Sequence, residues 1–266
     1  MRARDFILCL LTAGALLLQV SPHGAIADTE TTAPSSIDAN NPLADFRAFN
    51  LHNYYIPSLT ETDNQTANTF WARYAQPFGK WLFRGSLPMQ RVPTSITQTT
   101  SGLGDASAFA TYLFDTGNPG ISFGVGPQIV APTASEDATG AGKWQGGVAA
   151  TYFNATSAKL QWGGLVTWQA SFAGDSDRAD TNLLAVQPFV ILQLEKGWYL
   201  RSTAIAAFNL ETDSYHVPVG LGIGTVIPAG KKVFNVFVEP QFTILDRGAG
   251  QPELQIFAGF NTQFAE

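Results

Sequence analysis

Three arginines lie within segments that otherwise carry few charges: Arg73, Arg84 and Arg201. Each arginine falls in or near the middle of its segment, in phase with the more polar alternate positions. In a strand that crosses a membrane, a guanidinium facing hydrocarbon would cost about 2–4 kcal/mol, so all three side chains are expected to point inward. Arginines so placed either select solutes in a pore or form ion pairs that close it.

Carboxylates and amides at corresponding positions would complete such an interior. The candidate acidic partners of the arginines are Asp105, Glu211 and Glu239. The full set of candidate lumen-lining residues is Arg73, Arg84, Asp105, Gln128, Gln187, Arg201, Glu211, Glu239 and Gln241. A pore lining and a network of ion pairs that stiffens a closed barrel are both consistent with this set. A stripe of Gly220, Gly222 and Gly224 fits either the close approach of a ligand or backbone, or strong curvature.

Catalytic chemistry finds little support in the sequence. Beyond residue 27 the chain has two histidines, His52 and His216, and no cysteine, and neither histidine has the spacing of a metal-binding motif. Twelve-stranded outer-membrane phospholipases use a Ser and a His on the outer barrel surface, but His216 has no Ser-Asn-Gly neighbourhood. We therefore predict no catalytic residues, no metal site and no cofactor, and a membrane enzyme is only the third hypothesis.

One acidic segment could be taken for a calcium site. Asp175, Asp177 and Asp180 lie close together, and closely spaced carboxylates suit a hard cation. However, the glycine and the terminal glutamate of an EF-hand loop are absent, and Arg178 interrupts the cluster. A solvated external loop is therefore the favoured interpretation.

The elements that carry these residues are predicted by an alternation of apolar and polar residues with a period of two. The predicted strands are 44–56, 67–77, 80–91, 104–115, 120–132, 143–154, 158–172, 181–195, 197–211, 215–228, 231–245 and 252–264. In one of them, Trp162 and Trp168 share an apolar face while Gln161 and Gln169 share the opposite polar face. An apolar face toward lipid and a polar face toward a lumen are typical of a transmembrane β-barrel. A soluble β-sandwich, whose apolar face is the inner one, is the least favoured alternative.

The connections between these segments alternate in length. Even-numbered strands pass to the next through short turns such as Phe78-Gly79-Lys80, whereas odd-numbered strands exit into longer, more acidic segments. Short periplasmic turns and longer external loops are the expected asymmetry of outer-membrane barrels. Aromatic residues at strand ends are expected to form interfacial girdles: Trp81, Trp144, Trp198 and Tyr199.

The first 27 residues have the pattern of an export signal. Arg2 and Arg4 precede the apolar run 6–20, and Ala25-Ile26-Ala27 supplies small residues before a cleavage site. We divide the chain into a signal peptide (1–27), a flexible periplasmic lead (28–43) and an outer-membrane barrel (44–266). No segment reaches the roughly 20 apolar residues of a membrane-spanning helix.

Composition agrees with strands that have one lipid face and one polar face. Charged residues make up 14% of the chain and hydrophobic residues 45%, so charge is low without high overall hydrophobicity. The formal net charge is −6, which disfavours a polyanionic nucleic acid as a partner.

Several short motifs occur together in one order. They are Gly102-Leu-Gly-Asp105, Gly124-Val-Gly-Pro127 leading to Ala131-Pro-Thr-Ala134, Gly140-Ala-Gly-Lys-Trp144, Ser171-Phe-Ala-Gly-Asp175, Asn182-Leu-Leu followed by Gln187-Pro-Phe189, Gly197-Trp-Tyr199 and Val217-Pro-Val-Gly220. With this set, over about residues 41–264, the chain resembles a Gram-negative barrel family labelled transporter or neuromedin U-like, which is similar to the barrel proteins encoded with phenol meta-cleavage pathways. The resemblance implies an outer-membrane barrel for passage of small molecules and brings no catalytic residues. One departure is that Phe264 is followed by Ala265 and Glu266, whereas such barrels commonly end on an aromatic residue.

The sequence thus predicts an all-β protein, a single antiparallel transmembrane barrel of about twelve strands in the bacterial outer membrane. Our leading hypothesis for its function is a narrow passive channel or facilitator for small solutes, aromatic or weakly polar ones among them. The alternative is a structural or surface-binding barrel with an occluded lumen. The expected partners are membrane lipids and lipopolysaccharide, the barrel assembly machinery and a small solute that no residue identifies.

Overall fold

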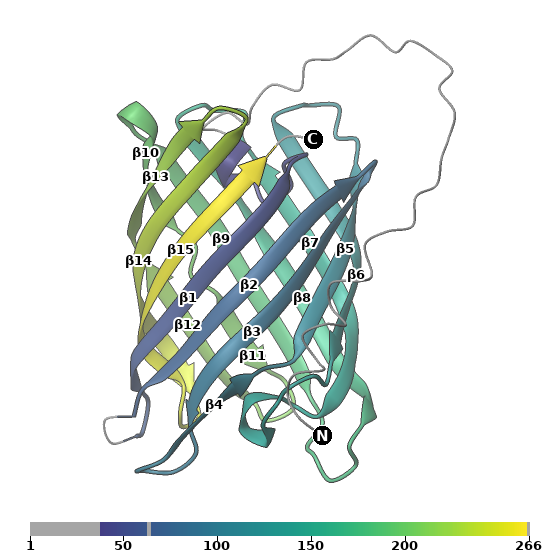
Figure 1. Cartoon of the computed structure of the whole chain (residues 1–266), viewed down its shortest axis with the longest axis vertical. Coiled ribbons are helices and arrows are strands. Elements are labelled where there is room, and N and C mark those ends of the chain that lie inside the picture. The colour runs from purple at the N-terminus through teal and green to yellow at the C-terminus, as the bar shows by residue number, and fades with distance from the viewer. Residues whose placement is uncertain (1–37, 63–64, 265–266) are drawn as a thin grey trace, which may run out of the picture. The chain divides into compact units, whose positions relative to one another are not determined.

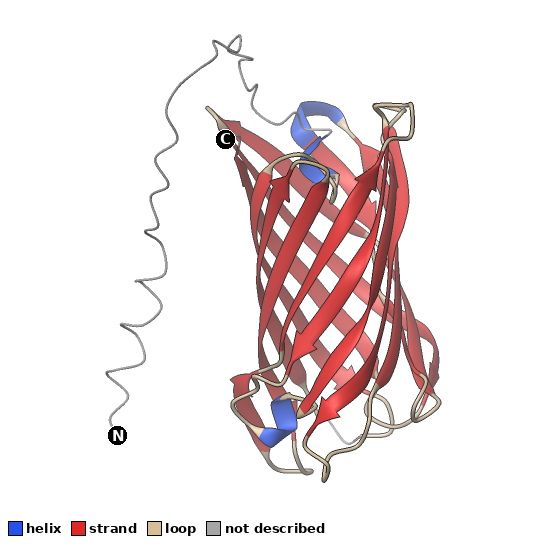
Figure 2. Cartoon of the chain, turned by 90° about the vertical axis from the view of Figure 1, so that its right-hand side faces the viewer, coloured by secondary structure: helices blue, strands red, loops and turns tan. Residues whose placement is uncertain are grey.

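The computed structural model describes residues 38–62 and 65–264 of the chain. The predicted signal peptide and residues 28–37 of the predicted lead lie outside the described residues. Among the residues so described, helix is limited to three single turns at the two ends of the barrel (Figure 2), η1 (Asp38–Asn40), η2 (Asp137–Thr139) and η3 (Glu195–Gly197). No helix in the described part of the chain is long and apolar enough to cross a membrane.

Antiparallel strands form one closed sheet (Figure 1). Its segments are β1 (Arg47–Leu59), β2 (Ala67–Phe78), β3 (Trp81–Pro93), β4 (Thr99–Leu103), β5 (Ala106–Phe114), β6 (Ile121–Ala131), β7 (Lys143–Asn154), β8 (Leu160–Gly174), β9 (Asn182–Gln193), β10 (Trp198–Ser202), β11 (Ala206–Asn209), β12 (Ser214–Gly220), β13 (Gly222–Ala229), β14 (Lys232–Arg247) and β15 (Pro252–Phe264). In three cases, two consecutive segments lie end to end and together form one strand of the barrel: β4 with β5, β10 with β11, and β12 with β13. The barrel therefore has twelve strands, and the pairing of β15 with both β1 and β14 closes it.

The twelve-stranded all-β barrel predicted from the alternation is confirmed, and each predicted strand appears within a few residues of its expected place. Two predicted strands, 197–211 and 215–228, are interrupted, and β4 forms in residues expected to belong to a loop, ahead of the strand predicted at 104–115. One interruption is at residues 203–205. If the strand pairing continued through these residues, they would lie between Pro188 of β9 on one side and Pro218 of β12 on the other. Neither proline has a backbone N–H to donate, so the sheet ladder is lost there.

The predicted faces of the strands are also observed. In β8, Leu160, Trp162 and Trp168 are exposed on the outer surface, while Gln161 is fully buried inside the barrel. The same alternation along β14 places Val236 and Val238 outside. These outward side chains form the apolar belt that contacts lipid.

The interior is more apolar than the polar lumen expected from the sequence. Buried aromatic residues gather within it: Tyr54, Phe153, Phe189, Tyr199, Phe237 and Phe257. Trp81, Trp144 and Trp198 are exposed at strand ends as predicted, but the prediction that Tyr199 belongs to the girdle is wrong. Because alternate residues of a strand face opposite sides, a tyrosine next to the outward-facing Trp198 must face inward.

The described part of the predicted lead, residues 38–43, lies inside the short-turn end of the barrel. The Asn235 side-chain amide donates hydrogen bonds to the backbone oxygen of Ala39 at 3.2 Å and to Asn40 Oδ1 at 3.0 Å. The Gln263 amide donates to the same Ala39 oxygen at 3.4 Å, and Leu43 is buried. These lumen amides and apolar contacts fix six residues that have no periodicity of their own, so their placement differs from the flexible lead expected from the sequence.

Candidate functional site

The lumen holds a cavity of about 310 Å³, which we call the central cavity. All three arginines predicted to face inward, Arg73, Arg84 and Arg201, line this cavity. Gln128 and Gln187 line it as well, whereas no carboxylate side chain among the described residues does. The wall of the central cavity is therefore cationic.

Two further cavities adjoin the central one. A cavity of about 460 Å³ shares Trp71 and Ser107 with it and reaches the loop residues around η2. A third, of about 310 Å³, shares Thr167 and Ala185 with the central cavity and extends to His216 in β12. Together they extend from residues 39–46 at the short-turn end toward the longer loops.

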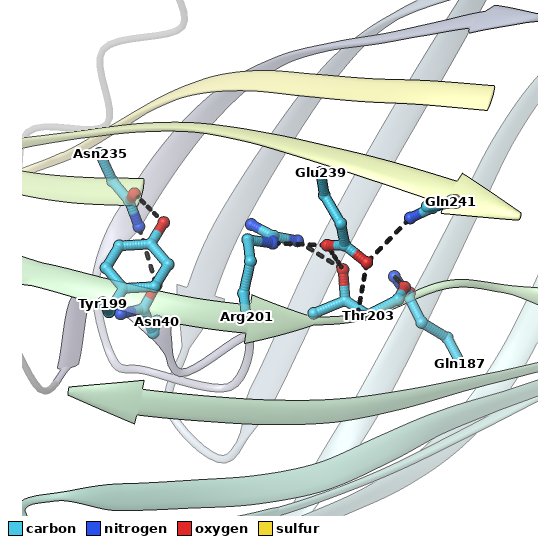
Figure 3. Close-up of polar contacts among 8 residues, drawn as sticks. All are labelled: Asn40, Gln187, Tyr199, Arg201, Thr203, Asn235, Glu239 and Gln241. Atoms are coloured by element: carbon cyan, nitrogen blue, oxygen red, sulfur yellow. Dashed lines mark hydrogen bonds and ion pairs between the residues drawn. The ribbon is translucent and has the colours of Figure 1, made fainter. Parts of the chain in front are cut away.

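One wall of the lumen is built around a buried ion pair (Figure 3). Glu239 of β14 is fully buried, and its Oε2 accepts hydrogen bonds from Arg201 Nε and from Thr203 Oγ1, both at 2.8 Å. Its Oε1 accepts the backbone N–H of Thr203 at 2.7 Å and the Gln241 amide at 3.1 Å. Arg201 also lies over the ring of Phe237, with its Cζ 3.5 Å from the ring centroid. A buried charge with this many donors is fully satisfied.

The predicted glycine stripe makes room for this arrangement. A Cβ added to Gly220 would lie 2.5 Å from Glu239 Oε1, and one added to Gly222 would lie 2.6 Å from Glu239 Cβ. A Cβ on Gly224 would collide with the ring of Tyr199. Small residues on β12 and β13 thus let two large side chains of neighbouring strands lie flat against the wall.

Tyr199 extends the same wall toward the short-turn end. Its hydroxyl donates to Asn235 Oδ1 at 2.5 Å, and the amide of Asn235 in turn holds η1 (Figure 3). These contacts form a second polar set on the wall that carries the buried ion pair, and they hold the lumen segment 38–43.

A second wall, formed by β1, β2 and β3 and separated from β14 by β15, is organised differently. Arg73 Nη1 donates to His52 Nδ1 at 2.6 Å. Because a guanidinium only donates, His52 accepts through Nδ1 and carries its proton on Nε2, which donates to Asn261 Oδ1 at 2.8 Å. The Asn50 amide donates to the same oxygen at 2.7 Å. This chain of contacts contains a cation and no anion.

Arg84 has the least satisfied side chain of the three. Among the described residues it has no hydrogen-bond or ion-pair partner, and its Nε is buried and unbonded. Its guanidinium lies 4.5 Å from the ring centroid of Phe109, which it faces across the β3–β5 pair. Arg73 lies in the same way 4.6 Å from the ring of Trp71.

The remaining predicted residues lie elsewhere or serve other contacts. Asp105 lines the cavity of about 460 Å³, where its carboxylate accepts the backbone N–H of Ala134 at 3.1 Å and of Ala141 at 2.7 Å. Glu211 is exposed in the turn after β11 and lines none of the three cavities. The Gln128 amide donates to Gln169 Oε1 along the wall, over Gly147 of the intervening strand β7. Of the three predicted carboxylates, only Glu239 is paired with a lumen arginine.

Three residues that complete the site are not among the predicted lumen-lining residues: His52, Trp71 and Thr203. Trp71 could have been found from phase alone, since it shares its face with Arg73. His52 lies opposite Trp71 in the β1–β2 register, which only the structure gives. Thr203 could not have been found from phase, because it contributes a backbone N–H that an interrupted strand frees.

The loops at the long-loop end are tied together by ion pairs. Lys143 Nζ lies 3.2 Å from Asp180 Oδ1, and Arg178 Nη1 lies 3.4 Å from Asp137 Oδ1. The Lys143 ammonium, through its hydrogen bond, lowers the pKa of the Asp180 carboxyl. No group of three or more metal-ligating side chains occurs among the described residues, and Arg178 donates into the backbone of the neighbouring loop at Asp137 O.

Known structures share this fold. An outer membrane channel from Pseudomonas putida F1 matches with a TM-score of 0.59 and 13% identity, over 82% of this chain and 94% of that one. The NanC porin matches with a TM-score of 0.52 and 6% identity, over 82% of this chain and all of that one. Likeness at such low identity concerns the fold. A search of curated proteins gave no match.

A closed antiparallel barrel with an apolar outer belt is the architecture of bacterial outer-membrane proteins, and this chain is one of them. By their general organisation, the short-turn end faces the periplasm. The profile of one protein family matches residues 38–187, more than half of the chain. On this match, the chain belongs to the family described as "Putative MetA-pathway of phenol degradation".

Proposed function

We propose that the protein is a narrow passive channel for small solutes across the outer membrane. The observation that carries this proposal is the set of adjoining cavities inside the closed barrel, from residues 39–46 to the long-loop end. Twelve strands are more than the eight whose interior is filled by side chains and fewer than the 16–18 of general porins. A central cavity of about 310 Å³ fits a small molecule and excludes an oligomer of sugars or amino acids.

The test is single-channel recording of the refolded chain from residue 28 onward in a planar bilayer. We expect discrete openings of small conductance, and uptake of small solutes but not of oligosaccharides in liposome swelling. Heat-dependent migration on a gel confirms that each preparation is folded. A folded barrel that neither conducts nor admits any small solute contradicts the proposal.

A second candidate function is an occluded structural or surface-binding barrel. One observation favours it: η1 and the residues after it occupy the short-turn end of the lumen, where Asn235 and Gln263 hold them. Substitution of Asn235 by Ala removes the side-chain contacts to Ala39, Asn40 and Tyr199. If the wild-type barrel is silent and this variant conducts, residues 38–43 close the pore. If both are silent, the occluded barrel is favoured.

A further inference from the structure

We propose that Arg73 and Arg84 form a binding site in the central cavity for a small aromatic carboxylate. The inference rests on the proposed channel function and names the class of solute that the channel would hold. It depends on three features of the β2–β3 wall: two neighbouring cations, the lack of an anion facing them among the described residues, and aromatic rings beside each cation.

The first feature is the placement of the two arginines. Arg73 pairs with Ser86 and Arg84 pairs with Ala75 in the β2–β3 register, so the arginines are diagonal neighbours on the inner face. The Cα atoms of diagonal neighbours in antiparallel strands are about 7–8 Å apart. Two cations on neighbouring strands of one cavity repel each other, and an anion between them would relieve the repulsion.

The second feature is the missing counter-charge. In the described part of the chain, the only carboxylate paired with a lumen arginine is Glu239, and Arg201 with Thr203 and Gln241 already saturates it. Arg73 Nε and Arg84 Nε are both buried without a hydrogen-bond partner. Buried donors of a charged group are costly to leave unbonded, and a carboxylate accepts two parallel N–H bonds from a guanidinium.

The third feature is the apolar surface beside the cations. The rings of Trp71 and Phe109 lie against Arg73 and Arg84, and the rings of Tyr54 and Phe189 line the same cavity. A fully hydrated inorganic anion gains nothing from such a surface, whereas an aromatic ring packs on it favourably. A planar aromatic ring that carries one carboxylate matches both the charge and the walls.

The binding test uses benzoate, with the refolded chain from residue 28 onward in detergent micelles and isothermal titration calorimetry as the readout. We expect benzoate to bind at least tenfold more tightly than benzyl alcohol, which lacks the charge, and than acetate, which lacks the ring. The Arg84→Gln and Arg73→Gln variants should each weaken benzoate binding about tenfold or more. The Arg84→Lys variant, which keeps the charge but loses the paired donors, should bind with intermediate affinity.

The matched control is Arg247→Gln. It removes the same charge from the long-loop rim, where Arg247 pairs with Asp213 at 2.6 Å, so benzoate binding should not change. Migration on an unheated gel shows whether each variant has folded. The proposal would be overturned if benzyl alcohol or acetate bound as tightly as benzoate. It would also be overturned if a folded Arg84→Gln variant bound benzoate as tightly as the wild type.

The outcomes also separate this site from the channel proposal. If benzoate binds as expected but planar bilayers show no conductance, the site stands and the channel function fails. If the barrel conducts and benzoate does not bind, the channel function stands and the site fails. In a conducting barrel, millimolar benzoate should also reduce the chloride current of the wild type more than that of Arg84→Gln.

Discussion

The two walls of the lumen use the same residue type in opposite ways. On the β10–β14 side, Arg201 contacts a fully buried carboxylate that accepts four hydrogen bonds. On the β2–β3 side, Arg73 donates to a neutral histidine and lies over the ring of Trp71, and Arg84 has no polar partner among the described residues. The comparison indicates that an arginine with its own counter-charge is neutralised within the wall, whereas an arginine without one is available to a solute.

The largest expected effect follows from removing one partner of the buried Arg201–Glu239 ion pair. The Glu239→Leu variant leaves Arg201 buried without its counter-charge, which should lower the free energy of unfolding by about 3–5 kcal/mol. Equilibrium unfolding in urea from lipid vesicles, followed by tryptophan fluorescence, measures this loss. The double variant Arg201→Met with Glu239→Leu removes both charges and should recover most of the stability. A single variant as stable as the wild type would refute the structural role of the pair.

A second, smaller effect should come from the glycine stripe. In Gly224→Ala the new Cβ collides with the ring of Tyr199, so we expect the free energy of unfolding to fall by about 1–3 kcal/mol. The matched control is Gly85→Ala in β3, where the nearest atom to the new Cβ is 3.7 Å away. The same urea experiment compares them, and equal stability of the two variants would show that Tyr199 moves aside freely.

The comparison becomes sharpest with Arg84→Met. No carboxylate loses its partner in this variant, so the free energy of unfolding should change by less than about 1 kcal/mol. Arg201→Met, by contrast, leaves Glu239 buried and unpaired and should be about as unstable as Glu239→Leu. If Arg84→Met and Arg201→Met destabilise the barrel equally, the two walls do not differ in the way described.

The smallest effect concerns the rim. Because Lys143 lowers the pKa of Asp180 in the folded state, this pair stabilises the fold above the unfolded pKa of the aspartate, and the contribution is lost as pH falls through the folded value. Lys143→Gln should raise the pKa of Asp180 toward its ordinary value in a carbon-detected NMR titration. Arg178→Gln, which breaks the pair with Asp137, should leave it unchanged. If the pKa of Asp180 is the same in Lys143→Gln as in the wild type, the ion pair with Lys143 is not the cause of the lowered pKa.

Much of the fold was predictable because a membrane barrel imposes its pattern on every strand. The alternation of Trp162 and Trp168 with Gln161 and Gln169 sufficed to predict both the strand and its faces. The same rule, applied to β10, would have placed Tyr199 beside Arg201 in the lumen. An aromatic residue at a strand end is typical of the girdle, but the phase of Tyr199 within the strand directs its side chain inward.

The candidate site was predictable only in part. Phase predicts that the three arginines face inward, and the structure places them at the central cavity, but pairing depends on strands distant in the chain, such as β10 and β14 for Arg201 and Glu239. Asp105 was an equally plausible partner by phase, yet it accepts backbone N–H groups of the loop around η2. Residues 38–43 carry no periodic signal, so their place in the lumen could not be inferred.

The strand number, the lipid-facing belt and the inward direction of Arg73, Arg84 and Arg201 can be inferred without a structure, because they follow from a local period of two and from the cost of a charge in hydrocarbon. Which arginine is neutralised depends instead on the closed fold. The closed sheet brings Glu239 and the freed N–H of Thr203 to Arg201, while no carboxylate of the described residues faces Arg84. Charge pairing is set by distances between strands, which the closure of the barrel fixes and the local alternation does not encode.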